Sequence, residues 1–210
     1  MRNKAGIVCM VLGTALILAA LFLFSRNQQE DRQAGERAEY IMEEMLEEIA
    51  EEMTEKMAEE TRQRGTEDET SVTDPYDSAM PEVIIDGYAY IGYLSIPAIG
   101  VELPVMSEWD YTRLKTAPCR YAGSPKAGNF VIAAHNYARH FGSLSCLSEG
   151  DQVFFTGMDG TVWDYAVDAV EVLAPAAVED MTESGYDLTL FTCTYGGASR
   201  VTVRCDRVRE

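Results

Sequence analysis

The sequence predicts a mainly β protein, in which one small closed barrel follows a membrane helix and an acidic stalk. From residue 83 onward, runs rich in Val, Ile, Tyr and Phe alternate with turn signals. Ahead of them lie a long uncharged segment and then a Glu-rich segment. We therefore expect a cytoplasmic tail over 1–4, a transmembrane anchor over 5–24, a helical stalk with a linker over 25–82, and a barrel over 83–210.

The N-terminal segment, "AGIVCMVLGTALILAALFLF", runs from Ala5 to Phe24 without a charged residue. A helix of that length spans about 30 Å, the thickness of the hydrocarbon core of a bilayer. Arg2 and Lys4 precede it and acidic residues dominate the segment after it, so the positive-inside rule places the N-terminus in the cytoplasm and the rest outside. A cleaved signal peptide is the alternative, but the apolar run is long and no clear A-x-A site comes after it.

Residues 36–62 are helix formers throughout, without Gly or Pro. Their apolar residues recur at spacings of three and four: Met42, Met45, Leu46, Ile49, Met53 and Met57. The opposite face is nearly all Glu. We expect a solvated stalk helix, and the alternative is a helix that pairs with itself or packs on the following domain. Residues 63–80 are polar, contain Gly and Pro, and are typical of a linker.

Seven runs in the last part of the chain have strand texture. They cover residues 88–96, 101–106, 129–135, 151–157, 161–173, 187–195 and 199–205. Asp-Gly at 159–160 predicts a hairpin turn between two of them, and Gly-Asp at 150–151 marks another turn. Trp109–Thr116 and Phe141–Leu147 are candidates for short helical turns. Mostly β texture over this length favours one closed barrel.

Charge and cysteine content exclude several functions. The net charge is −18, with 19 of the 35 acidic residues in 25–82, so a nucleic-acid partner is not expected. The cysteines at 9, 119, 146, 193 and 205 form no CxxC pair, which argues against a zinc site. An extracellular location permits disulfides among the outer four, but their spacing does not give the pairing.

Three residues near strand ends form the candidate catalytic set. His135 ends "NFVIAAH", Cys193 ends the run "LTLFTC", and Arg200 begins the next run after a short glycine turn. Taken singly, each has an ordinary structural explanation. Together they supply a thiol, an imidazole and an oxyanion donor, the parts that cysteine acyl transfer needs. The short turn predicts that the Cys193 and Arg200 strands are antiparallel neighbours. Arg204 shares a face with Arg200 and is the alternative arginine.

Several segments resemble the sortase family, in the family's order, over about residues 88–208. "LTLFTC" followed by an arginine-led strand is similar to the TLxTC signature, "VIAAHN" to the histidine segment, and "YIGYLSIPAIGVELPV" to the entry strands. The resemblance implies an eight-stranded sortase-type barrel with Cys193 as nucleophile, His135 as general acid/base and Arg200 as oxyanion and substrate donor. Thr192 is a weaker candidate for substrate binding, and His140 becomes a bystander.

The resemblance also implies a reaction and its partners. A sortase cleaves a C-terminal sorting signal such as LPxTG in secreted proteins and transfers the acyl group, through a thioester, to an amine on a peptidoglycan precursor or a pilin. No metal or other cofactor is required. The chain would be a single-pass protein of a Gram-positive cell membrane, with its catalytic domain extracellular.

Some features depart from the family pattern or leave its class open. Asp74-Pro75-Tyr76 resembles the lid tripeptide of pilin-building class C enzymes, but an ordinary Asp-Pro turn in a linker is the simpler interpretation. A class A- or D-like housekeeping role is equally compatible with the sequence. Cys119, Cys146 and Cys205 are not explained by the resemblance. An anchored binding or assembly protein on a sortase-like barrel, or a mainly hydrolytic peptidase, remains as an alternative.

Overall fold

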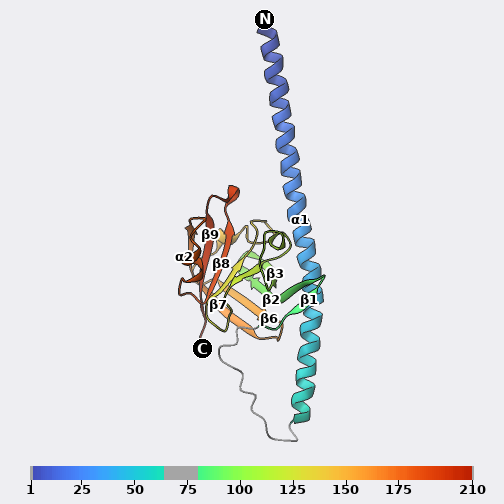
Figure 1. The fold of residues 1–210 in the computed structure, drawn as a ribbon, viewed down its shortest axis with the longest axis vertical. Helices are drawn as coiled ribbons and strands as arrows, with labels where there is room; N and C mark the ends of the chain where they lie inside the picture. The colour runs from blue at the N-terminus through green and yellow to red at the C-terminus, as the bar shows by residue number, and fades with distance from the viewer. Residues whose placement is uncertain (1, 64–79, 210) are drawn as a thin grey trace.

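The computed structural model describes residues 2–63 and 80–209, with side chains in the first range given from residue 6 to residue 56. It contains one long helix, α1 (Arg2–Gln63), beside a β-barrel with a short helix, α2 (Val178–Thr182). The strands are β1 (Val83–Ile85), β2 (Tyr88–Ile96), β3 (Val101–Met106), β4 (Cys119–Ala122), β5 (Phe130–Ala133), β6 (Gln152–Gly157), β7 (Val162–Leu173), β8 (Leu188–Cys193) and β9 (Arg200–Arg207). Figure 1 shows α1 running along one side of the barrel and extending far beyond it at its N-terminal end.

Eight of the strands close into a barrel in the order β2-β3-β4-β5-β8-β9-β7-β6, and β6 pairs with β2 to complete the ring. This confirms the predicted eight-stranded barrel. Two pairings are parallel, β3 with β4 and β5 with β8, and the others are antiparallel. Single 3-10 turns fall at Pro97–Ile99, Arg113–Lys115, Leu144–Cys146 and Tyr195–Gly197. The second and third of these lie in the two segments expected to form helical turns.

All seven runs of strand texture form strands, with bounds that agree to within a few residues. Two strands have no counterpart in the prediction. β4 is short, and β1 is joined to β2 by a two-residue turn in which both residues, Asp86 and Gly87, have positive φ. Asp-Gly is the preferred pair for such a turn, because glycine tolerates a positive φ without strain.

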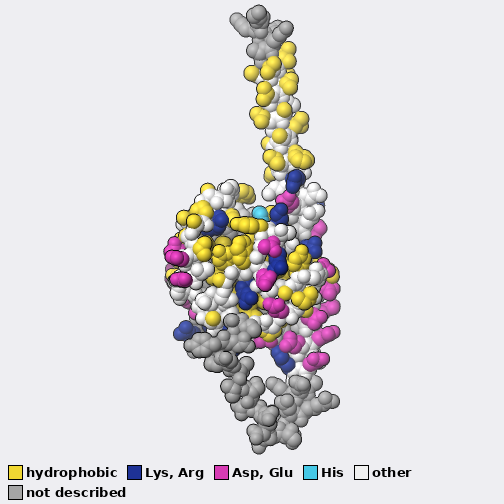
Figure 2. Space-filling view, viewed as in Figure 1, with side chains coloured by type: hydrophobic (Ala, Val, Ile, Leu, Met, Phe, Trp, Pro, Cys, Tyr) yellow, Lys and Arg dark blue, Asp and Glu magenta, His cyan; other side chains and the backbone are white. Residues whose placement is uncertain are grey.

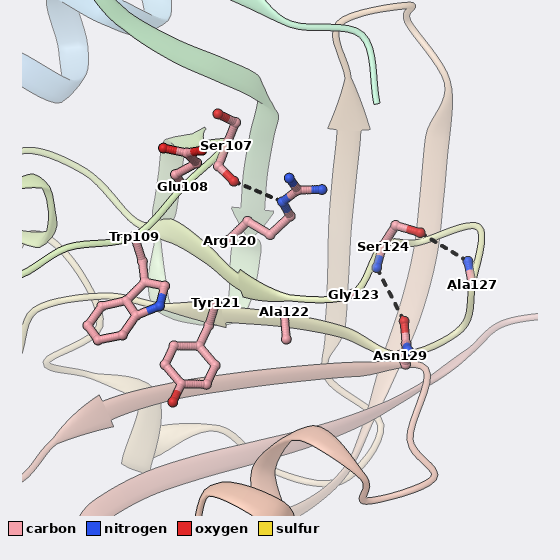
Figure 3. Close-up of a pocket in the computed structure, with 10 residues that line it drawn as sticks. All are labelled: Ser107, Glu108, Trp109, Arg120, Tyr121, Ala122, Gly123, Ser124, Ala127 and Asn129. Atoms are coloured by element: carbon pink, nitrogen blue, oxygen red, sulfur yellow. Dashed lines mark hydrogen bonds between the residues drawn. The ribbon is translucent and has the colours of Figure 1, made fainter. Parts of the chain in front are cut away.

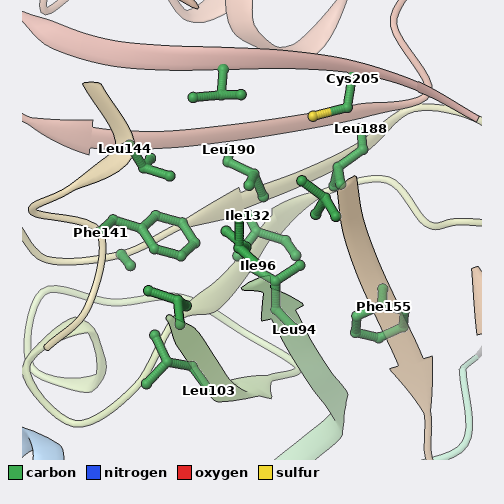
Figure 4. Packing of buried hydrophobic residues seen from close by; sticks show 14 of the residues in the cluster. Leu94, Ile96, Leu103, Ile132, Phe141, Leu144, Phe155, Leu188, Leu190 and Cys205 are labelled. Atoms are coloured by element: carbon green, nitrogen blue, oxygen red, sulfur yellow. The ribbon is translucent and has the colours of Figure 1, made fainter. Parts of the chain in front are cut away.

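The barrel interior is filled by side chains that point inward from alternate positions of its strands (Figure 4). Its core includes Leu94, Ile96, Ile132, Phe155, Leu188 and Leu190. Phe141 and Leu144, from the segment that follows β5, close one end of this core. Because each fully buried side chain of this size stabilises the fold by roughly 1.5–3 kcal/mol relative to exposure, the core fixes the strand register on which the site depends.

The acidic helix packs on the barrel, so the expectation of a solvated stalk is wrong and the alternative that it packs on the domain is right. Ile41, Met45 and Ile49 are buried and form a second cluster with residues of β1, β2 and β3, including Tyr90 and Met106. Removal of this apolar stripe from water favours packing of the helix on the barrel. Met42 is also buried, whereas Leu46 and Met53 stay partly exposed and the side chain of Met57 lies outside the described residues.

From Gly6 to Phe24, α1 is apolar on all sides and none of its residues is buried. Among the described residues, this is the only helix segment long and apolar enough to cross a membrane. Its most apolar stretch has a mean hydropathy of 2.8 and no buried residue. Figure 2 shows hydrophobic side chains covering this part of α1, with acidic side chains gathered along the part beside the barrel. The helix therefore changes its surroundings near Phe24, where the uncharged segment ends.

Candidate active site

The ends of three neighbouring strands bring His135, Cys193 and Arg200 to one rim of the barrel. β5 and β8 are parallel, with Ala133 opposite Phe191 and the amide of Ala134 bound to the Phe191 carbonyl, so His135 and Cys193, each two residues further along, follow at the same end of these strands. β8 and β9 are antiparallel, with Cys193 directly opposite Arg200. The three residues expected to carry the chemistry therefore follow one another across the ends of three adjacent strands.

Alternation along β8 determines which way the cysteine points. Leu188 and Leu190 belong to the barrel core, and Thr192 is buried in line with them. Cys193 therefore points to the outer face, together with Phe191 and Thr189. Its side chain is neither buried nor fully exposed. A thiol on the outer face at a strand end can be reached by a polypeptide, which a thiol inside the barrel could not be.

Thr192 joins the two strand ends to each other. Its hydroxyl is buried and donates a hydrogen bond to the carbonyl of Ala134 at 2.9 Å. The amide of Ala134 in turn donates to the carbonyl of Phe191 at 3.1 Å. These bonds extend the β5–β8 pairing up to His135. The hydroxyl of Thr192 thus contacts the histidine segment and points away from the outer face on which the predicted substrate would lie.

The turn between β8 and β9 is held by its own hydrogen bonds. The amide of Thr194 donates to the carbonyl of Ser199 at 3.0 Å, and the amide of Ser199 donates to the Thr194 hydroxyl at 3.1 Å. Gly196 and Gly197 both have positive φ within this turn. In Figure 1 the turn points in the direction of the N-terminal end of α1. It returns the chain in register, so that Arg200 faces Cys193.

The two candidate arginines lie in different surroundings. Arg200 is partly exposed, and its Nη1 donates only to the main-chain carbonyls of Gly197 and Ser199, at 3.3 and 3.2 Å. Arg204 is 3% exposed. Its guanidinium donates to Glu171 Oε1 at 2.6 Å, to Thr189 Oγ1 at 3.1 Å and to the carbonyl of Asp180 at 2.6 Å.

The imidazole of His135 is half-buried, and its Nδ1 has no hydrogen-bond partner among the described residues. Its ring stacks on that of Tyr137 at a centroid distance of 4.0 Å and an interplanar angle of 15°. Burial lowers the pKa of His135, and the charge of Lys115 lowers it further, while Glu30 opposes both. The imidazole is therefore mainly neutral at neutral pH and able to accept a proton.

His140 lies close by but is completely buried, and neither ring nitrogen has a hydrogen-bond partner among the described residues. Burial, and then the neighbouring His135, lower its pKa to about 4, against smaller effects of Asp31 and the main chain of Ala34. A buried neutral ring without access to solvent fits the expectation that His140 is a bystander.

An aromatic series leads away from the cysteine along the outer face. Phe191 packs edge to face on Tyr121 at 5.2 Å between ring centroids, and Tyr121 packs on Trp109 at 5.1 Å. Trp109 and Tyr121 line one side of a pocket of about 590 Å³, in which Figure 3 shows the two rings side by side. Arg120 points to the other side of β4 and donates from Nε to the carbonyl of Ser107 at 2.8 Å. No sequence pattern singles out these aromatic residues, because three separate segments contribute them.

With this geometry in view, comparison with known proteins is decisive for the family. A family model described as the sortase domain matches residues 94–208, more than half of the chain. The chain belongs to the sortase family. Among curated proteins, the sortase A of Bacillus anthracis is 26% identical over 132 residues, which are 60% of this chain and 62% of that protein. The chain thus spans somewhat less than two thirds of that curated relative.

Solved sortase structures share the fold. The sortase C of Streptococcus pneumoniae is 25% identical, with a TM-score of 0.58 and coverage of 81% of this chain and 97% of that one. The sortase C1 of Streptococcus suis is 30% identical, with a TM-score of 0.50 and coverage of 58% and 74%. A lid mutant of the sortase A of Corynebacterium diphtheriae is 25% identical, with a TM-score of 0.52 and coverage of 68% and 83%. Proteins named sortase A and sortase C are both similar to this sortase.

The remaining cysteines of this sortase are all free thiols. Cys119 and Cys205 are buried, and burial raises the pKa of Cys119 to about 12 and that of Cys205 further. Both therefore stay protonated and act as small apolar side chains. Cys146 is exposed. Within the described ranges, His, Cys, Asp and Glu side chains form no group of three that could hold a metal ion. The Asp74–Tyr76 tripeptide lies outside the described residues.

Proposed function

We propose that this sortase is a membrane-anchored cysteine transpeptidase with Cys193 as nucleophile, His135 as general acid/base and Arg200 as oxyanion and substrate donor. The observation that carries the proposal is the alignment of these three residues across the ends of β5, β8 and β9. The partial exposure of all three supports it, because a peptide laid along this rim can reach each of them. Arg200 is preferred to Arg204 because Arg204 is buried and already bound to three partners.

The proposed reaction begins with proton transfer from the Cys193 thiol to the neutral imidazole of His135. The sulfur attacks the scissile carbonyl carbon, and the guanidinium of Arg200 donates hydrogen bonds to the oxygen as it gains negative charge. The C–N bond then breaks as the imidazolium returns its proton to the leaving amine, which leaves a thioester. An acceptor amine attacks the thioester, loses a proton to His135 and releases Cys193.

The proposed substrate is a C-terminal sorting signal of the LPxTG type in a secreted protein. The acceptor is an amine on a peptidoglycan precursor or a pilin. The aromatic series from Phe191 to Trp109 offers apolar surface for the side chains of the signal next to the thiol. We further propose that residues 5–24 cross the cell membrane with the N-terminus in the cytoplasm, so that the barrel is extracellular. Both substrates would then meet the enzyme at the outer membrane face.

The test is acyl transfer by the full chain in detergent micelles, using LPxTG-type peptide libraries with and without an amine acceptor. We expect product that depends on the acceptor, together with a peptide–enzyme thioester detected by mass spectrometry. Cys193→Ala should abolish both, and Cys146→Ala, which removes an exposed thiol that lies on neither β8 nor β9, should change neither. Likewise His135→Gln should abolish transfer, whereas His140→Gln should retain it in the fraction that folds.

Other outcomes identify the alternatives. Cleavage without transfer would indicate a mainly hydrolytic peptidase. Absence of a thioester with every peptide would contradict both enzymatic proposals and leave the anchored binding or assembly protein. Loss of activity in folded His140→Gln together with retention in His135→Gln would show that the base is wrongly assigned.

A further inference from the structure

Tyr137 covers one face of the His135 ring. The two rings are nearly parallel, at 15°, with centroids 4.0 Å apart, and Tyr137 is almost completely buried. A phenol ring in this position restricts rotation of the imidazole and presents its electron-rich face to it. That face also favours the imidazolium form that the proposed reaction creates, since aromatic faces attract cations.

No hydrogen bond at Nδ1 orients the imidazole among the described residues. In catalytic histidines the second ring nitrogen usually donates to a carboxylate or a carbonyl, which fixes the orientation of the ring. Here Nδ1 of His135 is buried and has no hydrogen-bond partner among the described residues. The stacking contact with Tyr137 can supply the orientation that a hydrogen bond at Nδ1 would otherwise give.

Tyr137 is itself held by α1, immediately beyond the apolar segment of that helix. Its hydroxyl donates to Glu30 Oε2 at 3.5 Å. Two residues later, the amide of Arg139 donates to Asp31 Oδ1 at 3.1 Å, and Nη1 of Arg139 pairs with Glu39 Oε1 at 3.2 Å. Two successive acidic residues of α1 thus bind both ends of the 137–139 segment.

The segment after β5 and the facing surface of α1 are shaped for this contact. The carbonyl of Tyr137 accepts hydrogen bonds from His140 and Gly142, at 3.0 and 2.8 Å. A side chain on Gly142 would collide with that carbonyl. On the helix, Gly35 lies against the side chain of Arg139, and a methyl group there would overlap it. Glycine at both places allows the close approach that brings Glu30 and Asp31 to the loop.

We propose that Tyr137 is a positioning residue for His135, and that α1, through Glu30 and Asp31, sets the position of Tyr137. The inference rests on the proposed role of His135. It makes the membrane-proximal part of α1 a component of the active site, in addition to a tether. A displacement of α1 along the barrel would move Tyr137 and thereby tilt the imidazole relative to Cys193.

The experiment compares variants of the full chain in detergent micelles by kcat and KM for acyl transfer. Tyr137→Leu, which removes the ring, should lower kcat about 10- to 100-fold with KM within about two-fold, because small misplacements of a catalytic group have effects of that size. Tyr137→Phe keeps the ring and should stay within about three-fold of the parent, since only the hydroxyl contact is lost. The Glu30→Ala/Asp31→Ala double variant should lower kcat about 3- to 10-fold, and its two substitutions lie on the surface of a helix that remains packed through Ile41 and Met45.

The matched control is Glu47→Ala/Glu48→Ala, which removes two adjacent acids from the solvent side of α1 and should leave kcat unchanged. If this control lowers kcat as much as the Glu30/Asp31 variant, the effect is general to helix charge and the inference is wrong. If Tyr137→Leu does not fold, two variants still test the proposal. Tyr137→Phe tests the contact of the hydroxyl with Glu30, and the Glu30/Asp31 variant tests the contact of α1 with the 137–139 segment.

A second readout does not depend on turnover. The chain has two histidines, so a histidine-labelled sample gives two imidazole signals in NMR spectra, and His140→Gln assigns them. The ring protons of His135 should be shifted upfield by the stacked phenol ring, and the shift should disappear in Tyr137→Leu and persist in Tyr137→Phe. If the parent were inactive but showed this shift, the proposed function would be rejected while the stacking of Tyr137 on His135 would stand. A lost shift with unchanged kcat would reject the positioning role.

Discussion

The polar side chains at the two ends of one sheet face differ in their burial and in their hydrogen bonds. Along the outer face of β8 and β9, Arg204 and Thr189 face each other at one end, and Arg200 and Cys193 at the other. At the first end the arginine is buried and binds a carboxylate, a hydroxyl and a carbonyl. At the second end the arginine is partly exposed and reaches only two carbonyls of its own turn.

This difference separates a structural site from a reactive one. Buried polar groups are almost always satisfied within the protein, and their partners fix a single arrangement. Groups that a substrate must bind have to keep capacity for new hydrogen bonds and access to solvent. Two arginines on the same face of the same strand therefore have different expected roles, and substitution of each should change a different measurement.

The largest effect is expected for Arg200→Gln. Loss of the donor that faces Cys193 should lower kcat/KM about 10²- to 10³-fold, the usual result of removing one oxyanion donor. The melting temperature should change little, because Arg200 makes no contact outside its own turn among the hydrogen bonds of the described residues. Acyl transfer and thermal unfolding of the same preparation measure the two quantities. A strongly destabilised but fully active Arg200→Gln would reverse the assignment of the two ends.

The converse substitution, Arg204→Met, should act on stability. It leaves Thr189 Oγ1 and the Asp180 carbonyl without their donor and removes a short ion pair with Glu171. Glu171 is partly exposed and can be hydrated, which reduces the loss, so we expect unfolding to become easier by about 3 kcal/mol. At 25 °C kcat should stay within about three-fold of the parent while the protein is folded. Urea denaturation and acyl-transfer rates provide the check, and a loss of kcat without a loss of stability would favour Arg204 as the catalytic arginine.

Much of this arrangement was readable from the sequence, and the exceptions have physical causes. Period-two alternation and turn residues predicted the seven strands, and ordered motifs predicted the family. β1 was missed although Asp86-Gly87 carries a strong hairpin signal, because a three-residue strand has too little pattern of its own. The choice between Arg200 and Arg204 could not come from alternation, which places both on one face. It depends on Glu171, Asp180 and Thr189, which lie 33, 24 and 15 residues from Arg204 in the sequence.

The packing of α1 shows the same limit. Its stripe of Met and Ile has the spacing of an amphipathic helix. A second copy of the helix and the surface of the barrel could cover such a stripe equally well. Only the tertiary structure shows that Met45 is buried in one cluster with Tyr90 and Met106. The contact of Tyr137 with Glu30 likewise joins residues 107 apart in the sequence, and no local pattern predicts it.

His140 tests whether a buried polar group without a hydrogen-bond partner is sufficient to mark a reactive site. For this residue we expect the smallest effect of the series, a change in the unfolding free energy without a change in activity. It is buried beside His135 and Tyr137 on its own segment and beside Asp31 and Ala34 of α1, and its pKa is lowered from 6.5 to about 4. Between these two values the unfolded chain binds a proton that the folded chain does not, so stability is complete above pH 6.5 and declines as the pH falls. From pH 6.5 to 5 the unfolding free energy should drop by about 2 kcal/mol on account of this residue.

His140→Phe isolates that contribution, since it keeps a ring in the cavity and removes the titration. Urea unfolding of the full chain in detergent, followed by the fluorescence of Trp109 and Trp163, should show a shallower pH dependence for the variant than for the parent over pH 5–6.5. Carboxylates and His135 titrate in both proteins, so only the difference between the two curves belongs to His140. Parallel curves would mean that His140 is protonated as readily in the folded chain as in the unfolded one. The ring nitrogens of His140 would then donate hydrogen bonds to an acceptor that stabilises the charged form. A second group that titrates would lie beside His135, which would weaken the separation between the reactive and the structural parts of the barrel.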